Sequence, residues 1–151
     1  MLHTIHHANW QDHQADLIKI RAEVFMLEQD VSAADEWDGL DEQALHFLVL
    51  SPTNDALGCA RMLHEVINGK PFCHVGRVAI LKPFRGLGLG HELIAFIIKH
   101  CKKAAPESGI YLHAQTDRRS FYEALGFVAE GEVFMDAGIP HISMTLMQKE
   151  T

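Results

Sequence analysis

The sequence predicts a mixed α/β fold, with a central sheet of about six to seven strands flanked by about four helices. Size and composition are the first indication, because 151 residues with 48% hydrophobic and 22% charged residues make one domain that can bury a full core. The second is the order of the periodic segments: strand, long helix, three strands, helix, strand, helix and two strands. This order requires at least one parallel crossover. No repeat or linker divides the chain, so residues 1–151 are expected to form a single domain.

The first third of the chain predicts a strand, a long helix and a polar segment. Residues 2–8, "LHTIHHA", have strand character. Asp12 is a candidate helix cap, and residues 13–29 follow it with apolar residues at helical spacing. These apolar positions are Leu17, Ile20, Val24 and Leu27. Residues 30–44 are acidic and lack apolar periodicity, which predicts a loop with a short helix or a flexible lid.

Three strands joined by short turns follow. Strand-like runs at residues 45–51, 57–66 and 72–81 are separated by the turn sequences "PTNDA" and "NGK". This pattern predicts a meander. His74 and Arg77 lie three residues apart on the last of these strands, and a regular strand would place them on opposite faces.

The remainder of the chain alternates between helix and strand. The apolar face of the next helix consists of Leu93, Ile94, Ile97, Ile98 and Cys101. The elements expected after it are a strand at residues 110–115, a helix at 117–125 and strands at 127–135 and 139–147. Thr116 or Asp117 would start the second helix, and Gly126 stands where a glycine commonly ends one.

The stretch "KPFRGLGLGHEL" at residues 82–93 places three glycines at alternate positions in front of the apolar helix. Glycine loses more conformational entropy on folding than any other residue. Three glycines in this loop therefore indicate that side chains would block something here, such as a ligand that lies against the backbone amides. A strand, a glycine loop and a helix N-terminus together form an anion site, because free N–H groups and the helix dipole favour negative charge. The spacing excludes a P-loop, since His91 and Glu92 stand where Lys and Ser or Thr are needed. It also excludes the GxGxxG fingerprint, whose third position falls on Leu93.

This loop and its surroundings resemble the GNAT superfamily of N-acetyltransferases. Arg85-x-x-Gly88-x-Gly90 resembles the acyl-CoA pyrophosphate loop of that family. "HVGRVAILKPFRGLGLGHELI" is similar to its central strand, loop and helix, and "SFYEALGFVAEGEVF" to its second signature. "IRAEVFMLEQDV", followed by acidic residues and "LHFLV", is similar to the ElaA-like branch. The resemblance covers most of the chain and implies a GNAT-like fold with splayed parallel strands at the cofactor site.

The resemblance implies that acetyl-CoA is the co-substrate. Its pyrophosphate would bind the amides of the glycine loop, and its pantetheine would pair with the central strand, where the Ile80 amide is a candidate donor to the thioester carbonyl. The cofactor-binding residues expected from the resemblance are Val78, Ala79, Ile80, Arg85, Gly86, Leu87, Gly88, Leu89, Gly90, Asp117, Arg119 and Tyr122. Many family members carry an asparagine before the Phe-Tyr pair. This chain has "AQTDRRS" there, so the candidate replacements are Gln115, Thr116 and Asp117.

The resemblance also implies direct transfer of the acetyl group to a primary amine. Tyr122 occupies the family's general-acid position in "FYEALGF", and a phenol can protonate the leaving thiolate. The base that receives the ammonium proton, directly or through water, is expected among seven residues, of which Glu28 and His113 are preferred. The other five are Glu36, Asp38, Asp41, His46 and His74. Cys73 and Cys101 show no pattern of nucleophile and base, which favours direct attack. The alternative from another class is a non-catalytic acyl-CoA sensor that uses the same cleft.

The acceptor is expected to be an amine on a small molecule or a peptide, and no motif in residues 30–44 identifies it. Within this segment, residues 35–41 would either attract an amine, with Trp37 in a lid, or form a solvated acidic loop, which is the favoured interpretation. The C-terminal strand is a candidate for pairing with a second subunit, which would give a homodimer.

Composition and motifs argue against several other classes. With a net charge of −7, the chain lacks the overall basic character that is typical of nucleic-acid-binding proteins. No run approaches the roughly 18–20 apolar residues of a membrane span, and the N-terminal stretch lacks a signal-peptide pattern, so a cytoplasmic location is expected. Cys59, Cys73 and Cys101 contain no CxxC pair and are expected to be buried and reduced. Eleven histidines occur without HExxH, so no metal site is expected.

Overall fold

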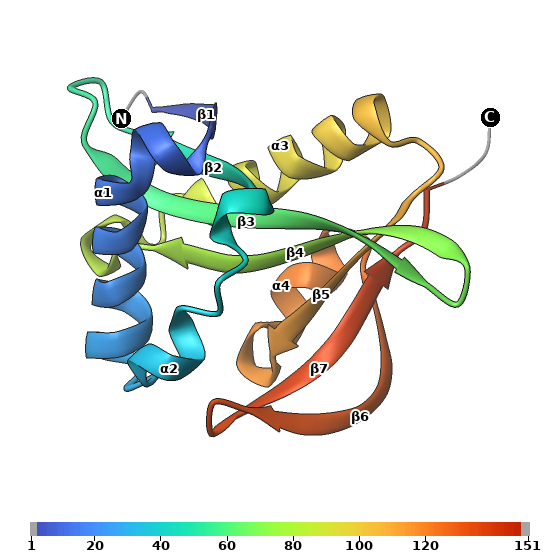
Figure 1. Cartoon of the computed structure of the whole chain (residues 1–151). Helices are drawn as coiled ribbons and strands as arrows, with labels where there is room; N and C mark the ends of the chain where they lie inside the picture. Colours follow the sequence, from blue (N-terminus) through green and yellow to red (C-terminus); the bar gives the residue numbers. More distant parts are fainter. Residues whose placement is uncertain (1–2, 149–151) are drawn as a thin grey trace.

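The computed structural model describes residues 3–148 and contains one seven-stranded sheet (Figure 1). The strands are β1 Thr4–Ala8, β2 Leu45–Leu50, β3 Ala56–Ile67, β4 Lys70–Ile80, β5 Gly109–Gln115, β6 Val128–Asp136 and β7 Ile139–Leu146. They lie in the order β1-β2-β3-β4-β5-β7-β6. β4 and β5 are parallel, and the other neighbouring strands are antiparallel. The predicted mixed sheet, with its meander and its parallel crossover, is therefore confirmed.

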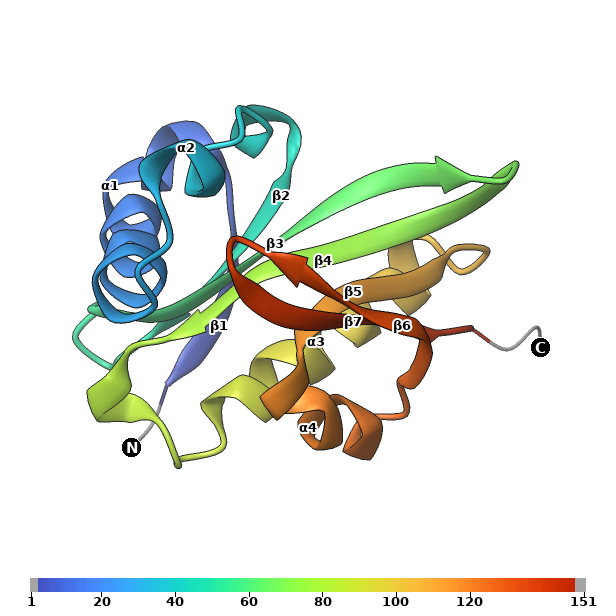
Figure 2. The same cartoon turned by 90° about the horizontal axis from the view of Figure 1, so that it is seen from below.

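Helices cover both faces of the sheet. They are α1 Trp10–Arg21, α2 Ala33–Glu36, α3 Leu89–Ala104 and α4 Arg119–Ala124, with a π-helical turn η1 Ala22–Glu28 and short 3-10 turns η2 Asp41–Gln43, η3 Lys82–Phe84 and η4 Thr116–Arg118. Figure 2 shows α1 and α2 on one face and α3 and α4 on the other. Each face has its own core, with Leu17 and Ile20 of α1 in one and Leu93 and Ile97 of α3 in the other. None of the helices within residues 3–148 is long and apolar enough to cross a membrane.

The first helix starts earlier and ends differently than the sequence predicts. Asn9 caps it in place of Asp12, because the Asn9 side chain accepts a hydrogen bond from the Asp12 N–H at 2.7 Å. After α1 the chain widens into η1, where the Gln29 N–H bonds to the Val24 carbonyl five residues back. The changed helical period leaves Leu27 82% exposed, so its predicted place on the apolar face is wrong.

A β-bulge interrupts β4 at Arg77. The register with β3 shifts here, and Arg77 has a φ of +51°. Val75 and Val78, three residues apart, consequently both pack toward the core beneath α3. His74 and Arg77 share the opposite face for the same reason, so their predicted placement on opposite faces is wrong.

Arg21, the last residue of α1, is the centre of a buried ion network. Its guanidinium donates to Oε2 of Glu36 at 2.7 Å and to Oδ1 of Asp41 at 2.6 Å. Arg21 is 1% exposed and Glu36 3%. Trp37 covers the guanidinium, with 4.9 Å between Cζ and the ring centroid. Because a buried charge is stable only when paired, this network ties the acidic segment of residues 35–41 to α1.

Arg61 of β3 and Arg77 of β4 extend the network onto the sheet. Arg61 donates to Asp38 and Asp41, and Nε of Arg77 donates to Glu36 at 3.1 Å. The hydrogen bonds from Arg61 hold the pKa of Asp38 far below its usual range, so this carboxylate stays ionised. The acidic segment is therefore not the solvated loop that the sequence predicts. Its paired carboxylates are also not free to attract an amine.

The C-terminal strand β7 lies inside the sheet, between β5 and β6. It has no free edge, so its predicted pairing with a second subunit is wrong, and a homodimer through another surface stays a prediction. β6 forms this edge of the sheet instead, and β1 forms the other. Its register with β7 shifts between Glu130 and Phe134, and Gly131 within this irregularity has a φ of +76°.

Replacing Arg21 with Met should destabilise the protein by about 3–5 kcal/mol, because Glu36 and Asp41 would lose their buried partner. Chemical denaturation of wild type and variant measures the difference. Arg119→Met is the matched control: Arg119 is paired with Glu123 on the surface at 3.5 Å, and its loss should cost less than about 1 kcal/mol. Equal effects of the two substitutions would contradict a structural role for the network.

Candidate active site

β4 and β5 pair over their first halves and then separate. The parallel register runs from Phe72 opposite Gly109 to Val75 opposite Leu112, and the bulge at Arg77 follows directly on β4. Figure 1 shows β4 continuing toward α1 while β5 leads away to α4. We call the place where β4 and β5 separate, beyond Val75 and Leu112, the fork. A cavity of about 810 Å³ lies at the fork and reaches the glycine loop. The predicted splay of the parallel strands is confirmed by this register.

Beyond the bulge, β4 directs alternate backbone groups into the fork. The Leu81 N–H bonds to β3 at 2.9 Å, whereas the Ile80 carbonyl accepts from Nε of Arg85 at 2.8 Å. The N–H and C=O of one residue point to the same side of an antiparallel strand. The amide of Ile80, and by alternation that of Val78, therefore faces the fork. Ala79 lies between these two residues, and its backbone N–H and C=O point toward β3.

The glycine loop between η3 and α3 leaves room for a ligand against its backbone. Gly86 and Gly88 have φ values of +79° and +80°, which L side chains rarely adopt. A Cβ added at either position would meet no described atom within 4 Å, and both residues line the cavity. Gly88 is also the N-cap of α3 and offers no side chain of its own. The amides of the first helical turn are therefore available to an anion.

An ion pair between Arg85 and Glu28 links this loop to η1. Its guanidinium donates to both carboxylate oxygens of Glu28, at 2.6 and 2.8 Å, in addition to the Ile80 carbonyl. The hydrogen bond and charge of Arg85 lower the pKa of Glu28. Glu28 is thus an ionised partner of Arg85 and a poor proton acceptor, and it does not line the cavity. The side chain of Arg85 is occupied, which leaves its backbone amide for a ligand.

Tyr122 of α4 lines the cavity from the α3 side of the sheet. Its ring packs edge-on against Phe121 and Phe127, with centroid distances of 5.0 and 5.8 Å. Burial raises the pKa of Tyr122 to about 12. The phenol therefore keeps its proton at neutral pH and can act as a proton donor.

Among the polar residues at the end of β5 and directly after it, some line the cavity and others do not. Gln115 lines the cavity, and its Nε2 donates to Oε1 of Gln29, at the end of η1, at 2.9 Å. Arg118 lines the cavity as well. Asp117 and Arg119, both predicted to bind the cofactor, are exposed and do not line it. Gln115 is therefore the candidate replacement for the family's asparagine that the fold brings to the site.

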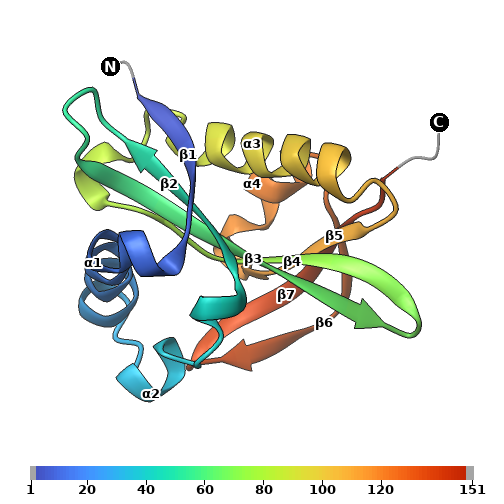
Figure 3. The same cartoon turned by 45° about the horizontal axis from the view of Figure 1, so that its top comes forward.

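The other end of the cavity lies on the sheet face that α1 and α2 share. Tyr111, His113 and Gln115 alternate along β5 and line this end together with His74 of β4. In Figures 1, 2 and 3 the turn between β6 and β7 lies on the same side as α2. Both segments line the cavity, through Glu36 of α2 and Ala137 of the turn. His113 was predicted from the sequence as a site residue and Tyr111 was not, although the period of two in "IYLHAQ" places both side chains on the same face of the strand.

His113 lines the same end of the cavity as His74. Partial burial and the charge of His74 lower the pKa of His113, and Asp136 opposes this shift. The imidazole is therefore neutral at pH 7. Of the two preferred candidates for the base, Glu28 and His113, His113 is the one that lines the cavity.

A model of the acetyltransferase (GNAT) domain matches residues 11–148. The chain belongs to the GNAT family. YyaT of Bacillus subtilis is 38% identical over 138 residues, which cover 87% of this chain and 89% of YyaT. ElaA of Escherichia coli is 32% identical over 145 residues, covering 89% of this chain and 94% of ElaA.

Solved GNAT structures match the fold closely. An acyl-CoA N-acyltransferase from Pseudomonas aeruginosa superposes with a TM-score of 0.82 at 30% identity, covering 95% of this chain and 97% of the other. The ElaA structure from E. coli gives a TM-score of 0.84 at 26% identity, covering 95% and 99%. The predicted family and its ElaA-like branch are confirmed. As a GNAT acetyltransferase, the chain uses an acyl-CoA donor.

Replacing Gly88 with Val should weaken acetyl-CoA binding at least about 100-fold, because a side chain would fill the space where GNAT enzymes place the pyrophosphate. Calorimetric titration measures the affinity. Gly69→Val in the turn between β3 and β4 is the matched control: Gly69 has a φ of +77° and equally open surroundings. Both variants carry the same backbone strain, so an equal loss of affinity in both would contradict the assignment.

Proposed function

We propose that this GNAT acetyltransferase transfers the acetyl group of acetyl-CoA to a primary amine of a small molecule or peptide by direct attack in a ternary complex. The observation that supports this most is a single cavity joining the glycine loop, the fork and the histidine-lined face. Donor and acceptor can enter from different ends and meet at the fork, as direct transfer needs. Cys59, Cys73 and Cys101 are buried as predicted, and none lines the cavity, so an acyl-cysteine intermediate is not favoured.

The donor would bind through backbone amides. Its pyrophosphate would lie on the amides of residues 85–90, where Gly86 and Gly88 leave open space. Its pantetheine would pair with Val78 and Ile80, and the Ile80 N–H would donate to the thioester carbonyl. A single donor of this kind typically contributes about 10²–10³ in rate. Arg118, which lines the cavity, is better placed for a phosphate than Arg119.

Tyr122 and His113 would handle the protons. Tyr122, still protonated at neutral pH, would donate its proton to the thiolate of CoA as the C–S bond breaks. His113 would accept a proton from the acceptor ammonium, which frees the nitrogen lone pair for attack. Glu28 is disfavoured in this role, because Arg85 occupies both of its carboxylate oxygens.

The purified chain should release free CoA from acetyl-CoA when a suitable primary amine is supplied. A thiol assay over a panel of amines measures the release, and calorimetry with acetyl-CoA and dephospho-CoA measures donor binding. Saturable binding with amine-dependent CoA release supports the proposal. Binding without CoA release for every amine would favour the alternative, a non-catalytic acyl-CoA sensor.

Tyr122→Phe should lower kcat by about 10²–10⁴, because the leaving thiolate would lose its proton donor. The affinity for acetyl-CoA should stay within about twofold of wild type, since the phenyl ring keeps its contacts with Phe121 and Phe127. Initial rates at saturating amine measure the effect. Wild-type turnover in this variant would remove Tyr122 from the mechanism.

A further inference from the structure

Glu65, His74 and Tyr111 form a hydrogen-bonded network on the sheet face that carries His113. Nδ1 of His74 lies 2.6 Å from Oε2 of Glu65, and the Tyr111 hydroxyl donates to Oε1 of Glu65. The Tyr111 oxygen also lies 3.1 Å from Nδ1 of His74. The three residues come from three neighbouring strands, β3, β4 and β5, and all of them line the cavity.

The carboxylate of Glu65 sets the tautomer of His74. Burial raises the pKa of Glu65, but the hydrogen bonds from Tyr111 and His74 outweigh it and hold the pKa below its usual value. Glu65 is therefore ionised and accepts both bonds. In the neutral form of His74, donation from Nδ1 to Glu65 leaves the lone pair on Nε2. A carboxylate that orients an imidazole in this way prepares it to accept a proton.

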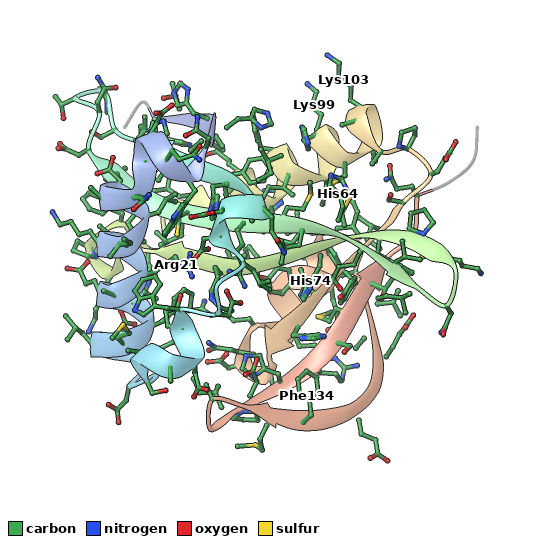
Figure 4. All side chains as sticks on the ribbon, viewed as in Figure 1. Arg21, His64, His74, Lys99, Lys103 and Phe134 are labelled. Atoms are coloured by element: carbon green, nitrogen blue, oxygen red, sulfur yellow. The ribbon has the colours of Figure 1, made fainter. Side chains whose placement is uncertain are left out.

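His74 lies beside His113 at the mouth of the fork. The two ring centroids are 5.1 Å apart, and His74 stacks on Tyr111 with a centroid distance of 4.2 Å. Figure 4 places His74 on the part of the sheet that α1 and α2 leave open, with Phe134 of β6 on the same side. The side chains of His74 and Glu65 are 24% and 34% exposed, so a proton held here can return to solvent.

We propose that His74, oriented by Glu65 and Tyr111, is a second proton acceptor of the active site beside His113. Glu65 and Tyr111 are positioning residues that act through His74. The inference rests on the proposed transfer to an amine and adds to it the group that completes proton removal from the nitrogen.

The chemistry requires two such removals. An ammonium acceptor loses one proton before its lone pair can form the N–C bond. The same nitrogen loses a second proton as the amide forms and the C–S bond breaks. Tyr122 protonates the thiolate sulfur and regains its proton from solvent, while the protons of both imidazolium ions leave to solvent. Each turnover thus converts an ammonium and acetyl-CoA into an amide, CoA with its thiol protonated, and one released proton.

Other titratable groups around the two histidines belong to four strands. They are Glu65 of β3, Tyr111 of β5, Asp136 of β6 and His141 of β7. Arg61 and Arg77 line the same cavity but are paired with carboxylates of the acidic segment. The acidic side of the pH profile should therefore report the two histidines, because both must be neutral to accept protons.

The test is the pH dependence of kcat/KM for wild type, His74→Gln and Glu65→Gln with acetyl-CoA and an amine that the wild type accepts. We expect the logarithm of the wild-type kcat/KM to rise with a slope approaching about two at acidic pH. His74→Gln should lower kcat/KM by about 10² and reduce this slope to about one. Glu65→Gln should cause a smaller loss and move the acidic limb to lower pH, because the imidazolium loses its negative partner.

His64→Gln is the matched control, because His64 precedes Glu65 on β3 but pairs with Cys73 toward α3. It should keep the wild-type profile. Acetyl-CoA affinity and thermal stability of His74→Gln should equal those of this control. A wild-type slope or rate in His74→Gln, or a loss explained by weaker donor binding or lower stability, overturns the assignment. A wild-type chain that releases no CoA with any amine overturns the proposed function and this assignment with it.

Discussion

The end of backbone pairing between β4 and β5 is the constraint on which the rest of the site depends. Pairing stops after Val75 and Leu112, and one inserted residue at Arg77 bends β4 away from its neighbour. The separation opens the cavity and leaves the amides of alternate β4 residues without a partner strand. The same bulge turns Arg77 to the face of α2, where it meets Glu36. One backbone irregularity thus creates the binding site and also supplies the anchor for a segment that lines it.

That anchor is ionic, and it ties the segment to three different elements of the fold. Arg21, Arg61 and Arg77 come from α1, β3 and β4, and together they neutralise Glu36, Asp38 and Asp41. Burying so many charges adds little net stability, because the loss of hydration offsets most of the attraction. What the network contributes is specificity: any other position of the segment would leave a buried guanidinium or carboxylate without its partner. The part of the cavity wall that this segment forms is therefore fixed by paired charges.

Periodicity and glycine placement were sufficient to predict the succession of strands and helices along the chain, the helix on each side of β5 and the glycine loop, because these features depend on neighbouring residues. Contacts between distant residues could not be predicted in this way. Glu28 meets Arg85 across 57 positions of sequence, and that pairing decides that Glu28 is a poor base. The bulge did leave a signal, since Gly76 stands inside a strand pattern, where an isolated glycine often marks such an irregularity. The widening of α1 into η1 left none that we can identify.

The outer edge of β6 has a consequence for how the molecule behaves when many copies are close together. An unpaired strand edge is a template onto which another chain can add a strand. Here three residues of β6 stand between its paired positions Glu130 and Phe134, opposite a single residue of β7, so the edge is kinked. Glu130 and Glu132 add negative charge along it and would repel the same edge of a second copy. The sheet can thus end in open solvent without being extended from one molecule to the next.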